Sequence, residues 1–346
     1  MWRCPFSREA PGRWVMLPSD LFLAARERVA PHVLTTPAWR DPDGRMHVKW
    51  ENHQRTGSFK LRGAVNKVLA LSPADLERGI VAASAGNHGQ GVAYAGRLCG
   101  ARVRVFASAQ ASPLKLEAMR ALGAEVMLIE GDYGRAELAA IDWGREHGAV
   151  WVSPYNDPLV IAGQGTLGLE ILADFQSLEV ATIVVPAGGG GLAAGIGCVV
   201  KMFRPKWRVI AVQSQASPFL HHSYKGLDLK QIRERPSVAD GLAGPVEEGS
   251  MTVELVREVV DEFLLLREEE IEQDVARAWQ EWGEKVEGSG AAGLGGAYRL
   301  GVKEQPVIAV VTGGNIDRDL HARLCTRWGI SASGAADLPP GVYSPQ

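Results

Sequence analysis

Residues 181–200 read ATIVVPAGGGGLAAGIGCVV, and this stretch indicates the class of fold. The apolar run 181–187 has the length of a buried strand, and the small apolar residues after the glycines are typical of a buried helix. Glycine lets the backbone take positive φ, so Gly188 to Gly191 can turn sharply and point several N–H groups at one anion. The start of the following helix adds a partial positive charge. The loop therefore predicts either a phosphate site or a tight structural turn.

The same alternation of strand and helix runs along most of the chain. Strands are expected at 47–52, 79–84, 102–108, 124–130, 149–155, 181–187, 208–214, 262–266 and 306–312. Helices are expected at 19–30, 88–100, 113–123, 135–148, 188–200 and 268–286, the third with Ser112 as N-cap and Pro113 in its first turn. Short apolar runs between amphipathic helices indicate βαβ units and parallel sheets buried on both faces. The predicted fold class is α/β, with sites at the carboxyl ends of strands.

Composition restricts the classes of function. The chain has 346 residues, a net charge of -3 and 46% hydrophobic residues, which is typical of a soluble globular protein. This charge gives no reason to expect nucleic acid or membrane as a partner, and no apolar run approaches the roughly 20 residues of a membrane span. Residues 1–16 and 331–346 read as flexible extensions. Neither a zinc site nor a disulfide scaffold is indicated, and a reduced cytoplasm is expected, because no CxxC pair occurs among Cys4, Cys99, Cys198 and Cys325.

Three further loops carry polar or small residues after predicted strands or helices. SAGNHGQG, residues 84–91, offers Asn87 and His88 to a carboxylate or a ring substituent; the alternative is a helix N-cap with a solvated histidine. VVTGGN places Thr312 and two glycines after a buried strand, and the alternative is a plain glycine turn. VEGSGA, residues 286–291, can equally be a helix C-cap and linker.

Lys60 lies in TGSFKLRGA, residues 56–64, among small and apolar neighbours. Burial of a lysine is costly, and it favours the neutral amine that imine chemistry requires. One ligand, pyridoxal 5'-phosphate, explains a phosphate loop, polar loops after strands and a secluded lysine together. It carries a phosphate, a ring hydroxyl, a pyridine nitrogen and an aldehyde.

The ordered motifs TGSFKLRGA, SAGNHGQGVA, AGGGGL, VADGLA, VEGSGAA and VVTGGN resemble those of the fold type II pyridoxal-phosphate enzymes, in the branch of threonine/serine dehydratases and serine racemases. The resemblance implies that Lys60 forms a Schiff base with the cofactor and that Phe59 packs near the ring. Further cofactor contacts are implied for Asn87 (ring hydroxyl), Thr312 (pyridine nitrogen), Gly241 (ring), and Gly188, Gly189, Gly190, Gly191 and Leu192 (phosphate). The loop implied to receive the substrate carboxylate comprises Ser84, Ala85, Gly86, Asn87 and His88.

The resemblance also implies how the chain is divided. A large cofactor domain would comprise residues 17–65 and 154–330, and a small mobile domain, residues 66–153, would close over the substrate. Both would be parallel-sheet domains with helices on both faces, in a homodimer or homotetramer. No metal site is expected, because Gln213 and Phe219 stand where cation-binding relatives have an acidic pair. Glu287 stands in the family's Glu-Pro-Ser-Gly-Ala segment, with glycine in place of proline, and its role is left open.

The reaction that the resemblance implies is deamination of a 3-hydroxy amino acid, such as L-threonine or L-serine, by β-elimination. Serine racemases have a serine before Gly-Asn-His that serves the face of Cα opposite the lysine. Here that residue is Ala85, whose methyl group cannot carry a proton. Racemisation and 3-hydroxyaspartate dehydration stay open as alternatives within the fold. An NAD-dependent oxidoreductase would leave Lys60 and the Asn87 loop unexplained, and a non-catalytic cofactor-binding protein would leave the lysine unexplained.

Overall fold

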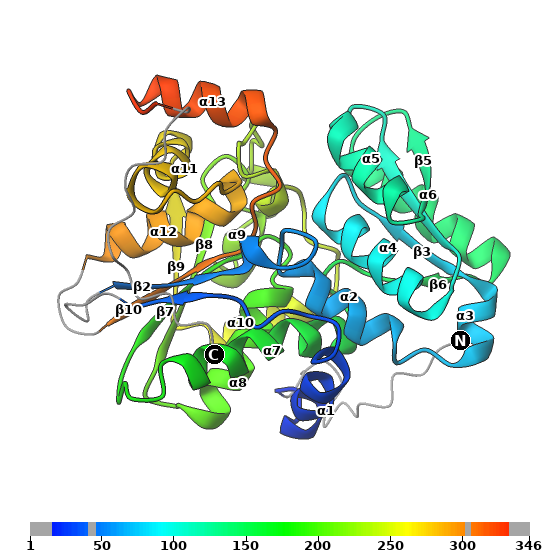
Figure 1. The fold of residues 1–346 in the computed structure, drawn as a ribbon, viewed down its shortest axis with the longest axis horizontal. Helices are drawn as coiled ribbons and strands as arrows, with labels where there is room; N and C mark the ends of the chain where they lie inside the picture. The colour runs from blue at the N-terminus through cyan, green and yellow to red at the C-terminus, as the bar shows by residue number, and fades with distance from the viewer. Residues whose placement is uncertain (1–15, 41–45, 302–305, 332–346) are drawn as a thin grey trace.

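Two sheets organise the computed structural model, which describes residues 16–40, 46–301 and 306–331 (Figure 1). The larger sheet has the strand order β1-β2-β10-β7-β8-β9, and the smaller sheet has the order β5-β4-β3-β6. Neighbouring strands are parallel except β1, which is antiparallel to β2. The strands are β1 (Ala38–Trp39), β2 (Met46–Trp50), β3 (Ile80–Ala83), β4 (Val103–Ser108), β5 (Glu125–Ile129), β6 (Val150–Trp151), β7 (Thr182–Pro186), β8 (Arg208–Ser214), β9 (Glu262–Leu266) and β10 (Val307–Val311).

Helices cover both faces of both sheets (Figure 1). One face of the larger sheet packs against α1 (Ser19–Val29), α7 (Pro158–Asp174), α8 (Gly191–Phe203) and α10 (Met251–Val259), and the other against α11 (Glu268–Trp282), α12 (Gly288–Leu300) and α13 (Arg318–Arg327). The smaller sheet packs against α2 (Lys60–Val68), α4 (Asn87–Cys99) and α5 (Pro113–Ala121) on one face and α6 (Tyr133–His147) on the other. The remaining elements are α3 (Pro73–Arg78), α9 (Phe219–Lys225) and the 3-10 turns η1 (Glu51–His53), η2 (Leu229–Gln231) and η3 (Asp240–Leu242).

The pleat of the strands explains why their sequences are apolar throughout. In β7, Ile183 and Val185 enter the core beneath α7 and α8, whereas Val184 enters the core beneath α11 and α12. In β3, Ile80 packs toward α4 and Val81 toward α6. Because successive side chains point to opposite faces and both faces are covered, every position of β3 and β7 is buried. The predicted α/β class with helices on both faces is confirmed.

Several local expectations differ from the structure. The strand expected at 149–155 has only the two residues Val150–Trp151, and helices such as α2, α7, α12 and α13 were not predicted. The linker alternative for residues 286–291 is wrong, because Glu287 is the N-cap of α12. Ser112 does stand at the N-cap of α5, but its side chain accepts no capping hydrogen bond. The expected extensions lie outside the described residues, apart from one residue at the inner edge of each.

Candidate active site

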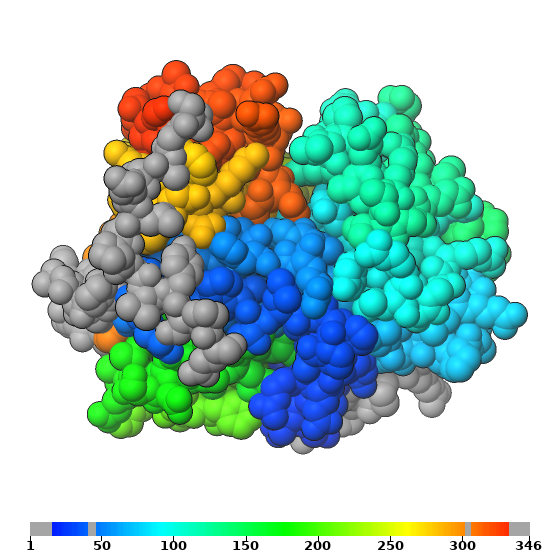
Figure 2. Space-filling model, in the orientation of Figure 1, coloured from blue at the N-terminus to red at the C-terminus, as the bar shows by residue number. Residues whose placement is uncertain are grey.

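A cavity of about 500 Å³ lies at the carboxyl ends of strands from both sheets, lined by the loops that follow β3, β6, β7 and β10. In the space-filling view the surface is hollowed between the cyan-green part of the chain and the orange-red part (Figure 2). The residues expected from the sequence all line this cavity: Phe59, Lys60, Ser84, Ala85, Gly86, Asn87, His88, Gly188, Gly189, Gly190, Gly191, Leu192, Gly241 and Thr312. The fold therefore brings together motifs that are far apart in the chain.

Lys60 is the first residue of α2, and its backbone is fixed against the loop after β10. The amide of Phe59 donates to the carbonyl of Thr312 at 3.0 Å, and Ser58 forms a β-bridge with Gly313. The amine Nζ donates to the carbonyl of Pro154 at 2.9 Å. Burial lowers the pKa of this amine to about 8, although nearby Glu287 opposes the shift. At pH 7 about a tenth of Lys60 is then neutral, far more than for a lysine with the ordinary pKa, and this neutral amine is the form that acts as a nucleophile or base.

The glycine loop between β7 and α8 has no room for side chains. A Cβ on Gly189 would overlap the ring of Tyr155, and a Cβ on Gly188 would lie 2.8 Å from the carbonyl oxygen of Gly241. Gly190 adopts φ 88°, which favours glycine. Within the described residues, the amides of Gly188, Gly189 and Gly190 donate to no other group. Free amides beside the first turn of α8 suit a phosphate.

The Asn87 side chain is fixed at both ends. Its Nδ2 donates to Oε1 of Glu287 at 2.6 Å, and its Oδ1 accepts from Nδ2 of Asn315 at 2.7 Å. Asn315 in turn donates to the carbonyl of Thr56, in the segment that leads to Lys60. One hydrogen of the Asn87 amide group is left for a bound molecule, because the group has two donors.

The rest of the 84–88 loop is held by the chain itself. His88 is buried and Nε2 lies 2.9 Å from the carbonyl oxygen of Val152. Burial, helped by the charge of Lys60, lowers the pKa of His88 to about 3, so the ring stays neutral. The hydroxyl of Ser84 accepts from the amide of Gly86 at 3.0 Å. The solvated histidine that was the alternative for this loop is therefore wrong.

On the opposite wall, hydroxyl groups hold the backbone in place. Thr312 donates from Oγ1 to the carbonyl of Ser289 at 3.3 Å, and the amide of Gly241 donates to Oγ of Ser289 at 2.9 Å. Thr312 also lines the cavity, and its hydroxyl can donate to a bound molecule when its hydrogen turns away from Ser289. It is then a neutral partner for a ring nitrogen.

Several cavity residues were missed by the sequence argument, namely Lys115, Tyr133, Glu137, Tyr155 and Asp240. Tyr133 donates to Glu137 at 3.0 Å, and Lys115 forms an ion pair with Asp240 at 2.8 Å. Asp240 stands beside Gly241 in the VADGLA motif, and Tyr155 ends the segment expected to be a strand, so both could have been found. No motif marks Lys115, Tyr133 or Glu137, because ordinary polar residues on helices reach the cavity only through the packing.

Gln213 uses its amide within the protein. It donates to the carbonyl of Leu242 at 3.1 Å and accepts from the amide of His221 at 3.1 Å. In residues 16–40, 46–301 and 306–331, no group of three or more His, Cys, Asp or Glu side chains could hold a metal ion. Among the helices that the structure describes, none has the length and apolar character needed to cross a membrane.

The site fits pyridoxal phosphate, because a cradle without side chains, a lysine of lowered pKa and a neutral hydroxyl share one cavity. Residues 29–313 match the family model described as pyridoxal-phosphate dependent enzyme. An L-threonine ammonia-lyase of Thermotoga maritima is 41% identical over 292 residues, covering 84% of this chain and 72% of the relative. Two solved structures have the same fold. A threonine deaminase of Solanum lycopersicum has a TM-score of 0.80 and 27% identity, and the match covers 94% of this chain and 99% of that one. A serine racemase of maize has a TM-score of 0.79 and 29% identity, and the match covers 90% of this chain and 95% of that one. The chain belongs to the pyridoxal-phosphate-dependent enzymes of fold type II.

Proposed function

We propose that the protein is an ammonia-lyase that converts L-threonine, L-serine or a related 3-hydroxy amino acid to a 2-oxo acid and ammonia. The observation that carries the proposal is the pairing of two residues in one cavity: Lys60, an amine of lowered pKa, and Ala85, which has no group to carry a proton. A base is therefore present for one face of Cα, and Ala85 offers none for the other. Elimination needs one base, whereas racemisation needs two.

Each residue contributes binding, orientation or a proton. The loop of Ser84 to His88 binds the substrate carboxylate, and the glycine cradle holds the cofactor phosphate. Neutral Lys60 removes the Cα proton, which Nζ then holds as an ammonium. Pyridoxal phosphate, when bound, supplies the electron sink for the charge left on Cα. Thr312 would meet the ring nitrogen with a neutral hydroxyl, which favours prompt elimination. The Lys60 ammonium returns its proton to the β-hydroxyl, which leaves as water, and hydrolysis of the enamine product then gives the 2-oxo acid and ammonia.

The charges of the cavity wall favour a substrate with an uncharged side chain. Asp132, Glu137, Glu234 and Asp240 contribute carboxyl groups. Of the two lysines that line the cavity, Lys115 is paired with Asp240 and Lys60 is the base of the proposed reaction. No arginine is among the described residues that line the cavity. A carboxylate on the substrate side chain would meet like charges, which costs free energy. This supports threonine and serine over 3-hydroxyaspartate.

Release of 2-oxo acid from a panel of amino acids tests the proposal. We expect turnover of L-threonine and L-serine, and little turnover of D-serine or 3-hydroxyaspartate. The Lys60→Ala variant serves as the control and should be inactive, and borohydride should no longer fix the cofactor to the chain. Turnover of L-threonine and L-serine no faster than in this variant would contradict the proposal.

Three broader expectations are part of the same proposal. The two sheets support a large domain of residues 17–65 and 154–330 and a small domain of residues 66–153 that closes over the substrate.

Cys99, Cys198 and Cys325 are free cysteines, which supports a reduced cytoplasm. A homodimer or homotetramer is proposed from the family resemblance, and light scattering on the purified protein measures it.

A further inference from the structure

Glu287 is a buried carboxyl group of the cavity wall without an assigned role. It is 4% exposed and stands at the N-cap of α12. Oε1 accepts the 2.6 Å hydrogen bond from Asn87, whereas Oε2 is buried and has no partner among the described residues. A buried polar atom without a partner is unfavourable, and Glu287 lines the cavity, so a bound molecule can supply the partner that Oε2 lacks.

Charged groups from three other elements face Glu287. They are Lys60 at the start of α2, Lys115 on α5 and Asp240 at the start of η3. Burial, and then Asp240, raise the pKa of Glu287 to about 7, against the opposing effects of Lys115, Asn87 and Lys60. Below this pH the carboxyl group is neutral and carries a hydrogen.

We propose that Glu287 is a cofactor-binding residue that acts as a neutral carboxylic acid. Oε1 fixes the Asn87 amide group, and the hydrogen on Oε2 is donated to an anionic oxygen of the bound cofactor. The inference rests on the cofactor site proposed above. Because Asn315 holds the other end of Asn87, the two donors reach the cavity from one rigid unit.

The neutral form is required by the chemistry of the partners. An ionised carboxylate only accepts hydrogen bonds, so it could not donate to an anionic oxygen. It would also repel that oxygen, and the burial of Glu287 strengthens the repulsion. Asp240 adds to this repulsion and disfavours the ionised form further.

Cofactor affinity of the apoprotein tests the proposal without turnover. Pyridoxal phosphate is titrated by absorbance into the unmodified protein, Glu287→Gln and Glu287→Ala, at pH 6 and pH 8.5. Glutamine can accept from Asn87 and donate in place of Oε2, so its affinity at pH 6 should stay within about threefold of the unmodified protein. Alanine should lower the affinity roughly tenfold or more, as expected for lost hydrogen bonds. Glu281→Gln, which changes an exposed carboxylate on α11 that pairs with Tyr298, is the matched control and should change nothing.

The pH dependence decides the protonation state. Since the pKa of Glu287 is about 7, raising the pH to 8.5 ionises the carboxyl group. The affinity of the unmodified protein for pyridoxal phosphate should then fall relative to the affinity of Glu287→Gln. Titration of the cofactor is common to both proteins and cancels in the ratio of their affinities. Titration of Lys60 does not cancel, because Glu287 raises the pKa of Lys60, so the comparison is repeated with Lys60→Ala in both proteins. The infrared band of a protonated carboxyl group in the apoprotein at pH 6 should decrease in Glu287→Gln; the remaining band would include Asp274, whose pKa burial also raises to about 7.

Two results would overturn the proposal. One is an affinity of Glu287→Gln for the cofactor as low as that of Glu287→Ala. The other is a ratio between the affinities of the unmodified protein and Glu287→Gln that does not change with pH. Either would mean that an ionised Glu287 is needed or that Oε2 does not bind the cofactor. If the affinities behave as expected but no lyase activity is found, the role of Glu287 stands and the proposed reaction is wrong.

Discussion

Two lysines in the same cavity have opposite pKa shifts, and the partner of each explains the difference. Burial lowers the pKa of Lys60 from 10.5 to about 8, and Nζ donates to a neutral group, the carbonyl of Pro154. Burial also acts on Lys115, but the charges of Asp240 and Glu287 and the hydrogen bond to Asp240 together outweigh it, and the pKa is raised. Lys115 therefore stays cationic at neutral pH, whereas Lys60 can release its proton. Only Lys60 is suited to act as a base.

Substitution of Ala85 tests the argument that one face of Cα lacks a proton carrier. In the unmodified protein we expect little D-serine from L-serine during turnover. Ala85→Ser adds a hydroxyl group that can exchange a proton, and D-serine should then form at a measurable rate. A chiral assay of the residual serine measures this, with Ala85→Gly as a control without a hydroxyl group. Formation of D-serine by the unmodified protein at a rate near that of pyruvate would refute the argument.

The sequence predicted site residues best where a residue type in its local context has few possible roles in a protein. A lysine among apolar residues and four glycines after a strand both restrict the chemistry, and the structure places Lys60 and the glycine cradle in one cavity. Lys115 and Tyr155 could not be predicted as a group, because their position depends on how the two sheets are packed. The hydrogen bond between Asn87 and Glu287 joins residues 200 positions apart, so no local pattern indicates it.

Helix α12 shows why some elements were missed. Its sequence GSGAAGLGGAYRL is rich in glycine, which weakens a helix by about 1 kcal/mol per residue relative to alanine. The structure requires these glycines: a Cβ on Gly293 would overlap the carbonyl group of Val310, and one on Gly290 that of Gly313. Close packing on β10 and on the loop after it thus outweighs the low intrinsic propensity.

The glycine cradle should not tolerate a side chain. In Gly189→Asp the Cβ would collide with Tyr155, and the carboxylate would repel a phosphate held by the amides. We expect cofactor affinity to fall at least roughly tenfold, the loss of one hydrogen bond or more, while circular dichroism stays unchanged. Gly134→Ala is the control, because its methyl group would meet nothing closer than Asp132 at 3.5 Å. Unchanged affinity in Gly189→Asp would mean that the phosphate binds elsewhere.

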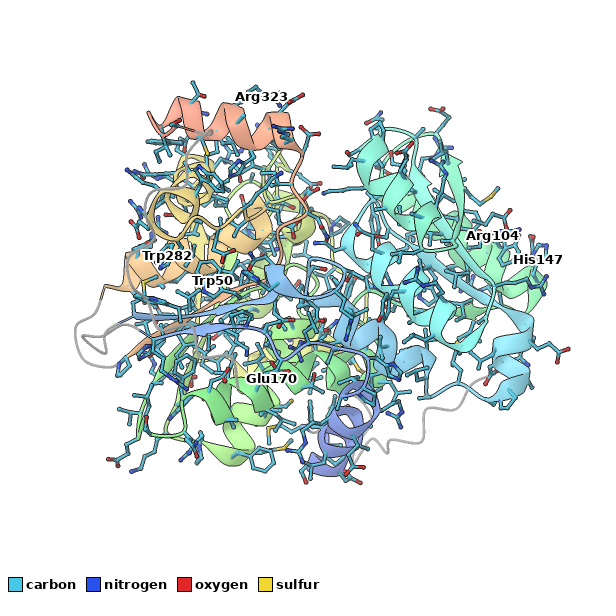
Figure 3. The ribbon with its side chains drawn as sticks, in the orientation of Figure 1. Trp50, Arg104, His147, Glu170, Trp282 and Arg323 are labelled. Atoms are coloured by element: carbon cyan, nitrogen blue, oxygen red, sulfur yellow. The ribbon has the colours of Figure 1, made fainter. Side chains whose placement is uncertain are left out.

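Helix α2, which carries Lys60, is anchored by a buried ionic network. Arg62 is fully buried and donates to Glu51 at 2.7 Å and to Glu170 of α7 at 2.7 Å; Glu170 is labelled in Figure 3. Arg62→Met would leave these carboxylates without their main partner. We expect the free energy of unfolding, from urea titration, to fall by roughly 3–5 kcal/mol. Arg145→Met, which removes an exposed pair with Asp142, should stay within about 0.5 kcal/mol, and equal effects would contradict the assignment.

At the scale of the whole molecule, the cavity wall combines residues from both sheets, so its shape depends on their relative position. The ion pair of Lys115 and Asp240 joins α5, beside the smaller sheet, to η3, beside the larger one. Lys115 is 17% exposed and Asp240 61%, so salt in the solvent screens the pair in part. The pair therefore stabilises the observed arrangement of the two parts, by an amount that depends on ionic strength.

Breaking this pair should weaken retention of the substrate more than it affects the chemistry. A partly exposed pair contributes about 0.2–1 kcal/mol, so Lys115→Met should raise KM for L-threonine by up to roughly fivefold, with a smaller effect on kcat. Lys115 also lines the cavity, and a double-mutant cycle with Asp240→Asn separates the pair from that contact: the two effects should not add, and the salt dependence of KM should decrease. Lys206→Met removes an exposed pair with Glu179 and should leave KM unchanged. Additive effects with unchanged salt dependence would show that the pair does not hold the two parts together.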